Sequence, residues 1–205
     1  MKKLIFLLAG IAVTVQLSNC KKSSDDDDDT PTVNQLCDGN GKDSWIPLDS
    51  TNHWDYKFTI AGQNQTSPTL TVGGTSVHGA NTYRVISDDS HLMYFDDYEV
   101  REDAATHNIY KYNDNNGNEY LEVPGSPTLN QTWALSSGYS RKITNLSASL
   151  STAGCNYTGL LEMIELDGNS ATVQTYYFKK GLGMVKKQGT GAFGNVYVLT
   201  AVSLK

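Results

Sequence analysis

The chain has 205 residues, of which 39% are hydrophobic and 19% are charged, and its formal net charge is −6. This acidic balance, without a basic stripe interleaved with aromatic residues, argues against a nucleic-acid partner. Length and apolar content are sufficient for one globular domain with its own core.

The N-terminal residues have the parts of a bacterial lipoprotein signal. Two lysines follow Met1, and the apolar run LIFLLAGIAVTVQL at positions 4–17 is shorter than the ~20 residues that a membrane-spanning helix needs. The run ends in Leu17-Ser18-Asn19-Cys20, which resembles the lipobox of bacterial lipoproteins. The resemblance implies a signal peptide over residues 1–19 and lipid on the thiol of Cys20. A simple secretory leader or an uncleaved anchor is the alternative.

An acidic, low-complexity stretch, CKKSSDDDDDTPTVNQ, occupies residues 20–35. Like charges repel and almost nothing apolar is available for burial, so this stretch is predicted to be a disordered tether. Its lysine, serine and aspartate run resembles the export signal of many Bacteroidetes lipoproteins. The resemblance implies a lipid-anchored protein of the cell envelope, held at the outer membrane and facing the outside.

The three cysteines predict one disulfide. If Cys20 carries lipid, Cys37 and Cys155 remain, and the cell envelope is an oxidising compartment. A Cys37–Cys155 bridge would close a long loop and stabilise the fold by a few kcal/mol, about 2–5 kcal/mol in the chain-entropy model. Two unpaired thiols are the alternative.

The region 36–205 is predicted to be a single all-β domain. Short β-rich or alternating runs are separated by turn signals such as Gly73-Gly74 and Asp167-Gly168. A dozen strands exceed one flat sheet, so the antiparallel meander should curl into a lipocalin-like barrel or fold over as a β-sandwich. The predicted strands are Trp54–Ile60, Thr69–Val72, Thr82–Ile86, Leu92–Phe95, Tyr98–Arg101, Asn108–Tyr112, Glu119–Val123, Thr132–Ala134, Lys142–Leu150, Leu160–Leu166, Thr172–Phe178, Gly183–Lys187 and Val196–Leu204.

Two long segments of this domain resemble a recurrent pattern of Bacteroidetes envelope lipoproteins of undefined function. They are IYKYNDNNGNEYLEVPGSPTLNQTW at 109–133 and YYFKKGLGMVKKQGTGAFGNVYVLTAVSLK at 176–205. The resemblance covers about the last half of the chain. It implies a curved antiparallel meander and brings no catalytic residues.

Known catalytic and metal-binding spacings are absent from the sequence. In GGTSVHG, residues 73–79, Ser76 lies near His78, but the G-x-S-x-G motif of hydrolases needs glycine at the position of His78. We therefore expect no enzyme activity, no catalytic residues, no cofactor and no metal. None of the four histidines has a partner at metal-ligand spacing: His53, His78, His91 and His107.

Charged clusters of the domain are interpreted as solvated surface. NDNNGNEYLE at 113–122 is predicted to be a hairpin turn, because an EF-hand reading would put Tyr112 at the first ligand position. The carboxylates of Glu162 and Glu165 are assigned to a solvated strand face. A solvated hairpin end is predicted for Lys179, Lys180, Lys186 and Lys187.

One short pattern suggests a modification site before the first predicted strand. Asp49-Ser50-Thr51 matches the triplet that the same bacteria O-glycosylate on exported proteins. Modification needs an exposed loop, and this region has no strand pattern. Ser50 is therefore a candidate O-glycosylation site.

Two functional hypotheses fit these observations. The first is a non-enzymatic surface lipoprotein, anchored to the membrane by its lipid, whose β-domain binds a glycan or protein partner; an exposed aromatic patch would favour it. The second is a lipocalin-like carrier of a small apolar ligand in the periplasm or outer membrane. That hypothesis requires a ligand-sized cavity.

Overall fold

The computed structural model describes residues 35–88, 98–135, 138–191 and 194–205. All of them belong to one unit, Pro31–Lys205. The predicted lipidation site Cys20, the signal peptide, the tether up to residue 34 and the predicted strand Leu92–Phe95 lie outside the described residues.

The described residues form one four-residue helix and thirteen strands, which confirms the all-β prediction. Two-residue strand β2 was not predicted. The elements are α1 (Gln35–Asp38), β1 (His53–Ile60), β2 (Gln63–Asn64), β3 (Thr69–His78), β4 (Asn81–Asp88), β5 (Tyr98–Glu102), β6 (Ile109–Asn113), β7 (Asn118–Val123), β8 (Thr132–Ala134), β9 (Ser140–Ser151), β10 (Asn156–Leu166), β11 (Thr172–Lys179), β12 (Gly183–Gly189) and β13 (Asn195–Ser203).

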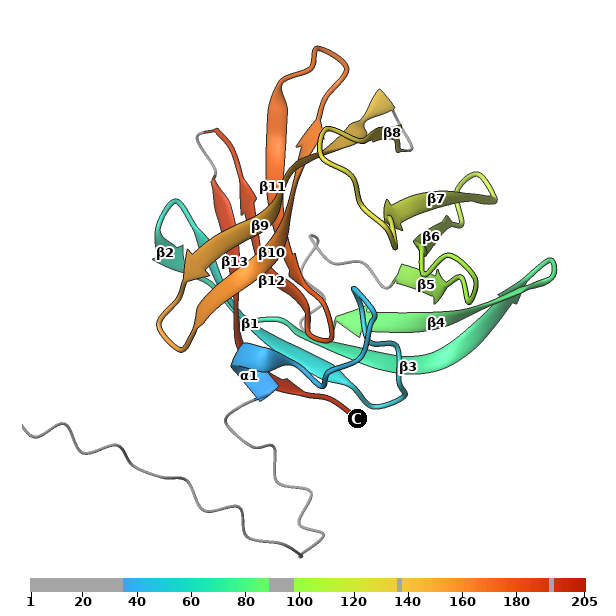
Figure 1. Ribbon diagram of the computed structural model, residues 1–205, viewed down its shortest axis with the longest axis horizontal. Coiled ribbons are helices and arrows are strands. Elements are labelled where there is room, and N and C mark those ends of the chain that lie inside the picture. The colour runs from blue at the N-terminus through green and yellow to red at the C-terminus, as the bar shows by residue number, and fades with distance from the viewer. Residues whose placement is uncertain (1–34, 89–97, 136–137, 192–193) are drawn as a thin grey trace, which may run out of the picture. The chain divides into compact units, whose positions relative to one another are not determined.

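The strands make one antiparallel meander that curls into a nearly closed barrel (Figure 1). Between the two shapes that the sequence left open, the structure therefore has the barrel. The first long strand, β1, pairs with the last, β13, over His53–Ile60 and Asn195–Ser203. The free ends of the sheet are β7 and β8, which follow each other along the chain.

Side chains bridge the two free ends of the sheet. The Trp133 indole Nε1 on β8 donates a hydrogen bond to the Leu121 carbonyl on β7, at 2.7 Å. Arg141 Nη1 on β9 donates to the Glu122 carbonyl at 2.9 Å. These bonds satisfy carbonyls of an edge strand that has no ladder partner on that side among the described residues.

Strand β3 corrects one turn prediction. Gly73-Gly74 was interpreted as a turn, but it lies inside β3, where the register against β4 shifts between Val72 and Thr75. The shift is a β-bulge, which bends a strand without ending it. The true turn follows at Gly79, whose φ of 61° suits glycine. β3 therefore extends to His78.

Aromatic and aliphatic side chains on the inner face form the core. Phe58 and Tyr197 stack with ring centroids 4.3 Å apart. The Tyr56 hydroxyl donates to the Met184 carbonyl at 2.8 Å, which satisfies a buried polar atom. The strand tyrosines Tyr56, Tyr83 and Tyr176 are also buried.

The disulfide between Cys37 and Cys155 is present, with the two Cα atoms 5.5 Å apart. It joins α1 to the connection between β9 and β10, across a sequence separation of 118 residues. Closing a loop of that length in the unfolded chain is worth about 4–5 kcal/mol in the chain-entropy model. The bridge thus fixes the start of the domain to the barrel.

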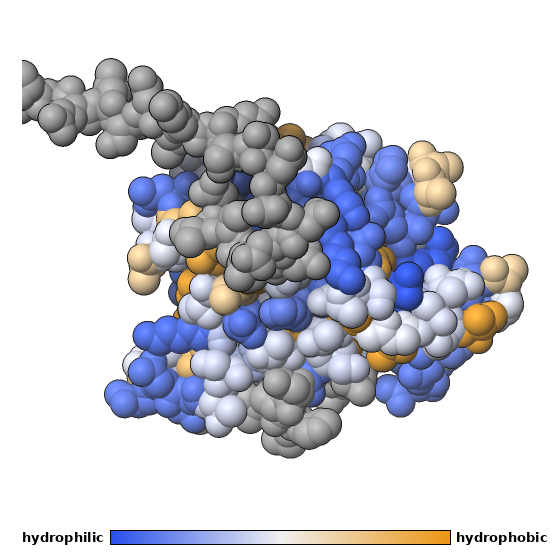
Figure 2. All heavy atoms as spheres, turned by 90° about the horizontal axis from the view of Figure 1, so that it is seen from below, coloured by the Kyte–Doolittle hydropathy of each residue, from blue (hydrophilic) through white to orange (hydrophobic). Residues whose placement is uncertain are grey.

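The exposed surface of the described residues is mainly polar, as the face in Figure 2 shows. Their exposed large hydrophobic side chains are Val77, Leu129, Tyr139 and Leu146, of which one is aromatic. The described part of the chain contains no helix of the length and apolarity needed to span a membrane.

Candidate functional site

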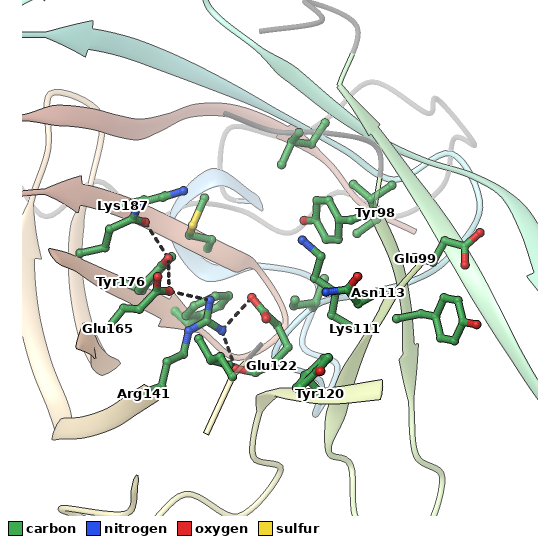
Figure 3. A pocket seen from close by; sticks show the side chains of 18 of the residues that line it. Tyr98, Glu99, Lys111, Asn113, Tyr120, Glu122, Arg141, Glu165, Tyr176 and Lys187 are labelled. Atoms are coloured by element: carbon green, nitrogen blue, oxygen red, sulfur yellow. Dashed lines mark hydrogen bonds and ion pairs between the residues drawn. The ribbon is translucent and has the colours of Figure 1, made fainter. Parts of the chain in front are cut away.

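The barrel contains a cavity of about 570 Å³ that opens to solvent (Figure 3). Its walls come from both halves of the sheet, including β1, β3 to β7 and β9 to β12. Small-molecule sites in proteins usually measure about 300–1,000 Å³. The cavity therefore has the size that the carrier hypothesis requires.

One wall of the cavity is apolar. It includes side chains from the segment before β1 and from five strands, and most of them are buried. Inward positions of neighbouring strands place these side chains on one continuous surface. The apolar wall consists of Ile46, Trp54, Leu70, Ile86, Phe178 and Met184.

The charged wall of the cavity contains an interior ion cluster (Figure 3). The cluster consists of Glu122, Arg141 and Glu165, from β7, β9 and β10. Arg141 Nη1 lies 2.8 Å from the Glu122 carboxylate, and Nη2 lies 3.5 Å from Glu165. The Arg141 side chain is only 6% exposed. Its guanidinium also covers the ring of Tyr176 at 4.6 Å. Both carboxylates are therefore held by one buried cation.

Glu122 and Arg141 favour each other's charged forms. Burial alone would raise the pKa of Glu122, but the charges of Arg141 and Lys111 outweigh burial, and the pKa lies below its ordinary value. Burial also opposes the charge of Arg141, while Glu122 and Glu165 raise the guanidinium pKa.

Two lysines add positive charge to the same cavity. Burial, with a contribution from the nearby charges of Arg141 and Lys111, lowers the pKa of Lys187 to about 8. Its ammonium lies 5.7 Å from the ring centroid of Tyr176 and 5.6 Å from that of Tyr197. Lys111 Nζ lies 4.9 Å from the centroid of the Tyr98 ring, and its charge acts on Glu122 without a direct ion pair among the described residues.

A second group of polar side chains, the rim cluster, consists of His78, Glu99 and Asp114. Glu99 and Asp114 line the cavity, and Asp114 is exposed. Figure 3 shows Glu99 well away from Arg141. One ligand atom from each of the three residues lies within 4.8 Å of the other two.

Two interpretations of charged residues as solvated surface were wrong. Glu165 and Lys187 both line the cavity. Each continues an apolar face of its strand: Glu165 follows Met163 on β10, and Lys187 follows Val185 on β12. A charged residue two positions after a buried apolar residue lies on the same face of a strand. This spacing was the signal in the sequence that could have placed both side chains inside. Alternation by itself does not reveal that a face turns towards a hollow interior.

The predicted disulfide and glycosylation residues lie away from this cavity. Cys37 and Cys155 form the disulfide and do not line it. Ser50 lies in an exposed turn before β1, where a modifying enzyme could reach it. Its O-glycosylation stays a prediction. The segment at 113–122 forms the hairpin between β6 and β7, as predicted, but it also contributes Asp114 and Glu122 to the lining of the cavity. His91 lies outside the described residues.

Comparison with known proteins adds little. No protein-family model and no curated protein matches the chain. A candidate exported protein with a YmcC-like fold from Bacteroides fragilis has 9% identity and a TM-score of 0.43, over 77% of this chain and 97% of its own. A candidate lipoprotein from Parabacteroides distasonis has 12% identity and a TM-score of 0.38, over 80% of this chain and all of its own.

A third structure, a candidate outer-membrane lipoprotein-sorting domain from Vibrio parahaemolyticus, has 6% identity and a TM-score of 0.21, over 78% of this chain and 86% of its own. The three neighbours are thus described as exported proteins or lipoproteins. At these identities and TM-scores they support no argument about function. The function of this chain is therefore argued from its own residues.

Proposed function

We propose that this chain is a non-enzymatic cell-envelope lipoprotein that binds a small anionic amphiphile inside its barrel. The observation that carries the proposal is the cavity of about 570 Å³ with one apolar wall and one charged wall. A ligand of matching chemistry has a short hydrocarbon part and one acidic head group.

The side chains around Lys111 and Lys187 favour an anionic head group at that side of the cavity. Arg141 neutralises one of the two carboxylates that it holds, while Lys111 and Lys187 add two positive charges. These five groups sum to one positive charge when both lysines are protonated, whereas Glu99 and Asp114, which also line the cavity, bring the whole lining to one negative charge. A carboxylate or phosphate near Lys111 would gain a charge-assisted interaction that the free protein lacks.

The apolar wall favours a hydrocarbon tail. Ile86 and Leu70 are 1% and 3% exposed, and both line the cavity. Each methylene group moved from water onto such a surface gains about 0.8 kcal/mol. A hydrocarbon tail therefore adds to the binding free energy, and the head group supplies orientation.

The cavity favours the carrier hypothesis over the surface-partner hypothesis. The four exposed large hydrophobic residues of the described chain include only one aromatic, Tyr139. That is not the aromatic patch that a glycan- or protein-binding face would present. The ligand expected from sequence was apolar, and the charged wall changes this expectation to an amphiphile.

Lipid on Cys20 would anchor the carrier to the membrane, and the aspartate-rich tether would hold the barrel away from it. The support is the lipobox-like sequence Leu17-Ser18-Asn19-Cys20 and the acidic run after it. Outward orientation at the outer membrane is tested by external protease on intact cells. Release of the barrel supports that orientation, and protection until lysis contradicts it.

Calorimetric titration with dodecanoate tests ligand binding, with dodecanol as the uncharged control. We expect one molecule per chain and tighter binding of the anion. Ile86→Trp fills the cavity and should abolish binding, whereas Val77→Trp, at a 67% exposed position of β3, should not.

A matched pair of lysine variants tests whether the head group binds at Lys111. Lys111→Met should weaken dodecanoate binding about tenfold, the equivalent of ~1.4 kcal/mol, and leave dodecanol unchanged. Lys57→Met, at an exposed position of β1 outside this cavity, should change neither. Equal binding by wild type and Ile86→Trp would refute the interior site.

A further inference from the structure

We propose that the rim cluster of His78, Glu99 and Asp114 is a binding site for a zinc-like divalent transition-metal ion. The inference goes beyond ligand binding in the barrel and does not depend on it. One nitrogen and two carboxylate oxygens lie within 4.8 Å of one another, on three separate parts of the sheet.

Strand pairing brings the three residues together. His78 ends β3, Glu99 lies on β5, and Asp114 begins the turn after β6. Glu99 is paired with Tyr112 across the β5–β6 ladder, two residues before Asp114. The β3–β4 and β4–β5 ladders then bring the end of β3 next to them.

Protein contacts alone hold the ring of His78 in its orientation. It stacks on Tyr112 with centroids 3.6 Å apart and planes at 15°. Tyr83 meets it edge-on at 5.4 Å, and the Tyr83 hydroxyl is itself tied to Glu119 at 2.6 Å. The Nε2 atom of His78 therefore points at the Glu99 carboxylate, with which it forms a hydrogen bond.

The two carboxylates of the cluster lack a fixed cation. Glu99 interacts only with His78, and Asp114 has no hydrogen-bond or ion-pair partner, among the residues that the structure describes. Arg101, on the same strand as Glu99, is already engaged by Glu119 through two bonds. A bound dication would offset charges that the protein leaves unbalanced.

The donor set selects the kind of ion. Imidazole together with carboxylates suits Zn²⁺, which takes four ligands and binds with three protein groups where one position stays open. Ca²⁺ prefers six to eight oxygen ligands, and a histidine nitrogen is a poor ligand for it. Exposure of Asp114 provides a route from solvent.

Calorimetric titration of the purified full chain with Zn²⁺ tests the site. We expect one ion per chain in addition to weak binding by the aspartate-rich tether. His78→Gln and Asp114→Asn should each lower the affinity at least tenfold, because even indirect changes around a metal commonly cost ~10–100-fold. Excess Ca²⁺ should not displace the ion.

His107→Gln is the matched control, because His107 also contacts a carboxylate, Glu102, at 2.8 Å but belongs to no three-ligand group in the described residues. It should bind Zn²⁺ like wild type. Circular dichroism checks the fold, and Co²⁺ substitution reports a ligand-field spectrum that His78→Gln should lose. Absence of a specific site in wild type, or equal affinity in all variants, would overturn the proposal.

Discussion

The interior ion cluster and the rim cluster each contain two carboxylates beside the same cavity, yet they are neutralised differently. Glu122 and Glu165 share the guanidinium of Arg141, whose side chain is 6% exposed. Glu99 and Asp114 have only the His78 ring among the described residues, and Asp114 is exposed. The first cluster is a fixed part of the fold, and the second is open to exchange with solvent.

Burial explains the difference. A charge removed from water must have a permanent partner, because the desolvation penalty reaches several kcal/mol per ion. A charge at the rim keeps part of its hydration, so it needs no permanent protein partner and can bind an ion from solvent. The comparison predicts large stability effects from the interior cluster and mainly metal-binding effects from the rim.

Removing the interior cation should have the largest effect. Arg141→Met leaves two carboxylates, only 18% and 16% exposed, without their cation, and it removes the bond to the Glu122 carbonyl at the sheet edge. We expect the free energy of unfolding to fall by about 3–5 kcal/mol, measured by urea denaturation at pH 7. Arg84→Met, on β4 and outside the cavity, should cost much less. Equal losses would show that the cluster is not specially important.

Removing the partly buried ammonium of Lys187 should stabilise the protein. The pKa of Lys187 falls from 10.5 to about 8 in the folded state, so folding opposes its charge. This penalty is fully present below pH 8 and disappears as pH rises towards 10.5. Its size is about 3 kcal/mol at most.

Lys187→Met should therefore raise the free energy of unfolding at pH 7 by ~2 kcal/mol, after losses of cation–π contacts. The gain should shrink as pH rises through the window from 8 to 10.5. Denaturation at several pH values measures it, with Lys57→Met as control. A pH-independent or destabilising effect would contradict the assigned burial cost.

The smallest stability effect is expected at the rim. Glu99→Gln keeps a hydrogen-bond partner for His78 and removes one uncompensated charge. Without metal, its free energy of unfolding should stay within about 0.5 kcal/mol of wild type. Thermal denaturation with and without Zn²⁺ measures both states, and wild type alone should gain stability from the ion. A large metal-free loss would place Glu99 with the structural carboxylates.

Local sequence patterns predicted most of the strands because each is a short run between turn residues. The disulfide followed from counting cysteines in an oxidising compartment. The prediction of a turn at Gly73-Gly74 was wrong because a glycine pair suits a turn and a β-bulge equally. Only the pairing with β4 decides between the two.

The two clusters could not be predicted in the same way. His78, Glu99 and Asp114 become neighbours through the register of four strands, whereas spacing motifs detect only ligands that are close along the chain. Arg141 lies in step with buried Ile143 on β9, just as Glu165 lies in step with Met163. That pattern marks charges on an inner face, but curvature decides whether the face encloses a cavity.

A crystal structure of the chain with dodecanoate tests the central claim most directly. The account predicts one molecule inside the barrel, with its carboxylate within about 4 Å of the Lys111 ammonium and its tail against Leu70 and Ile86. Dodecanoate bound only on the outer surface, or a barrel interior filled by side chains, would contradict it.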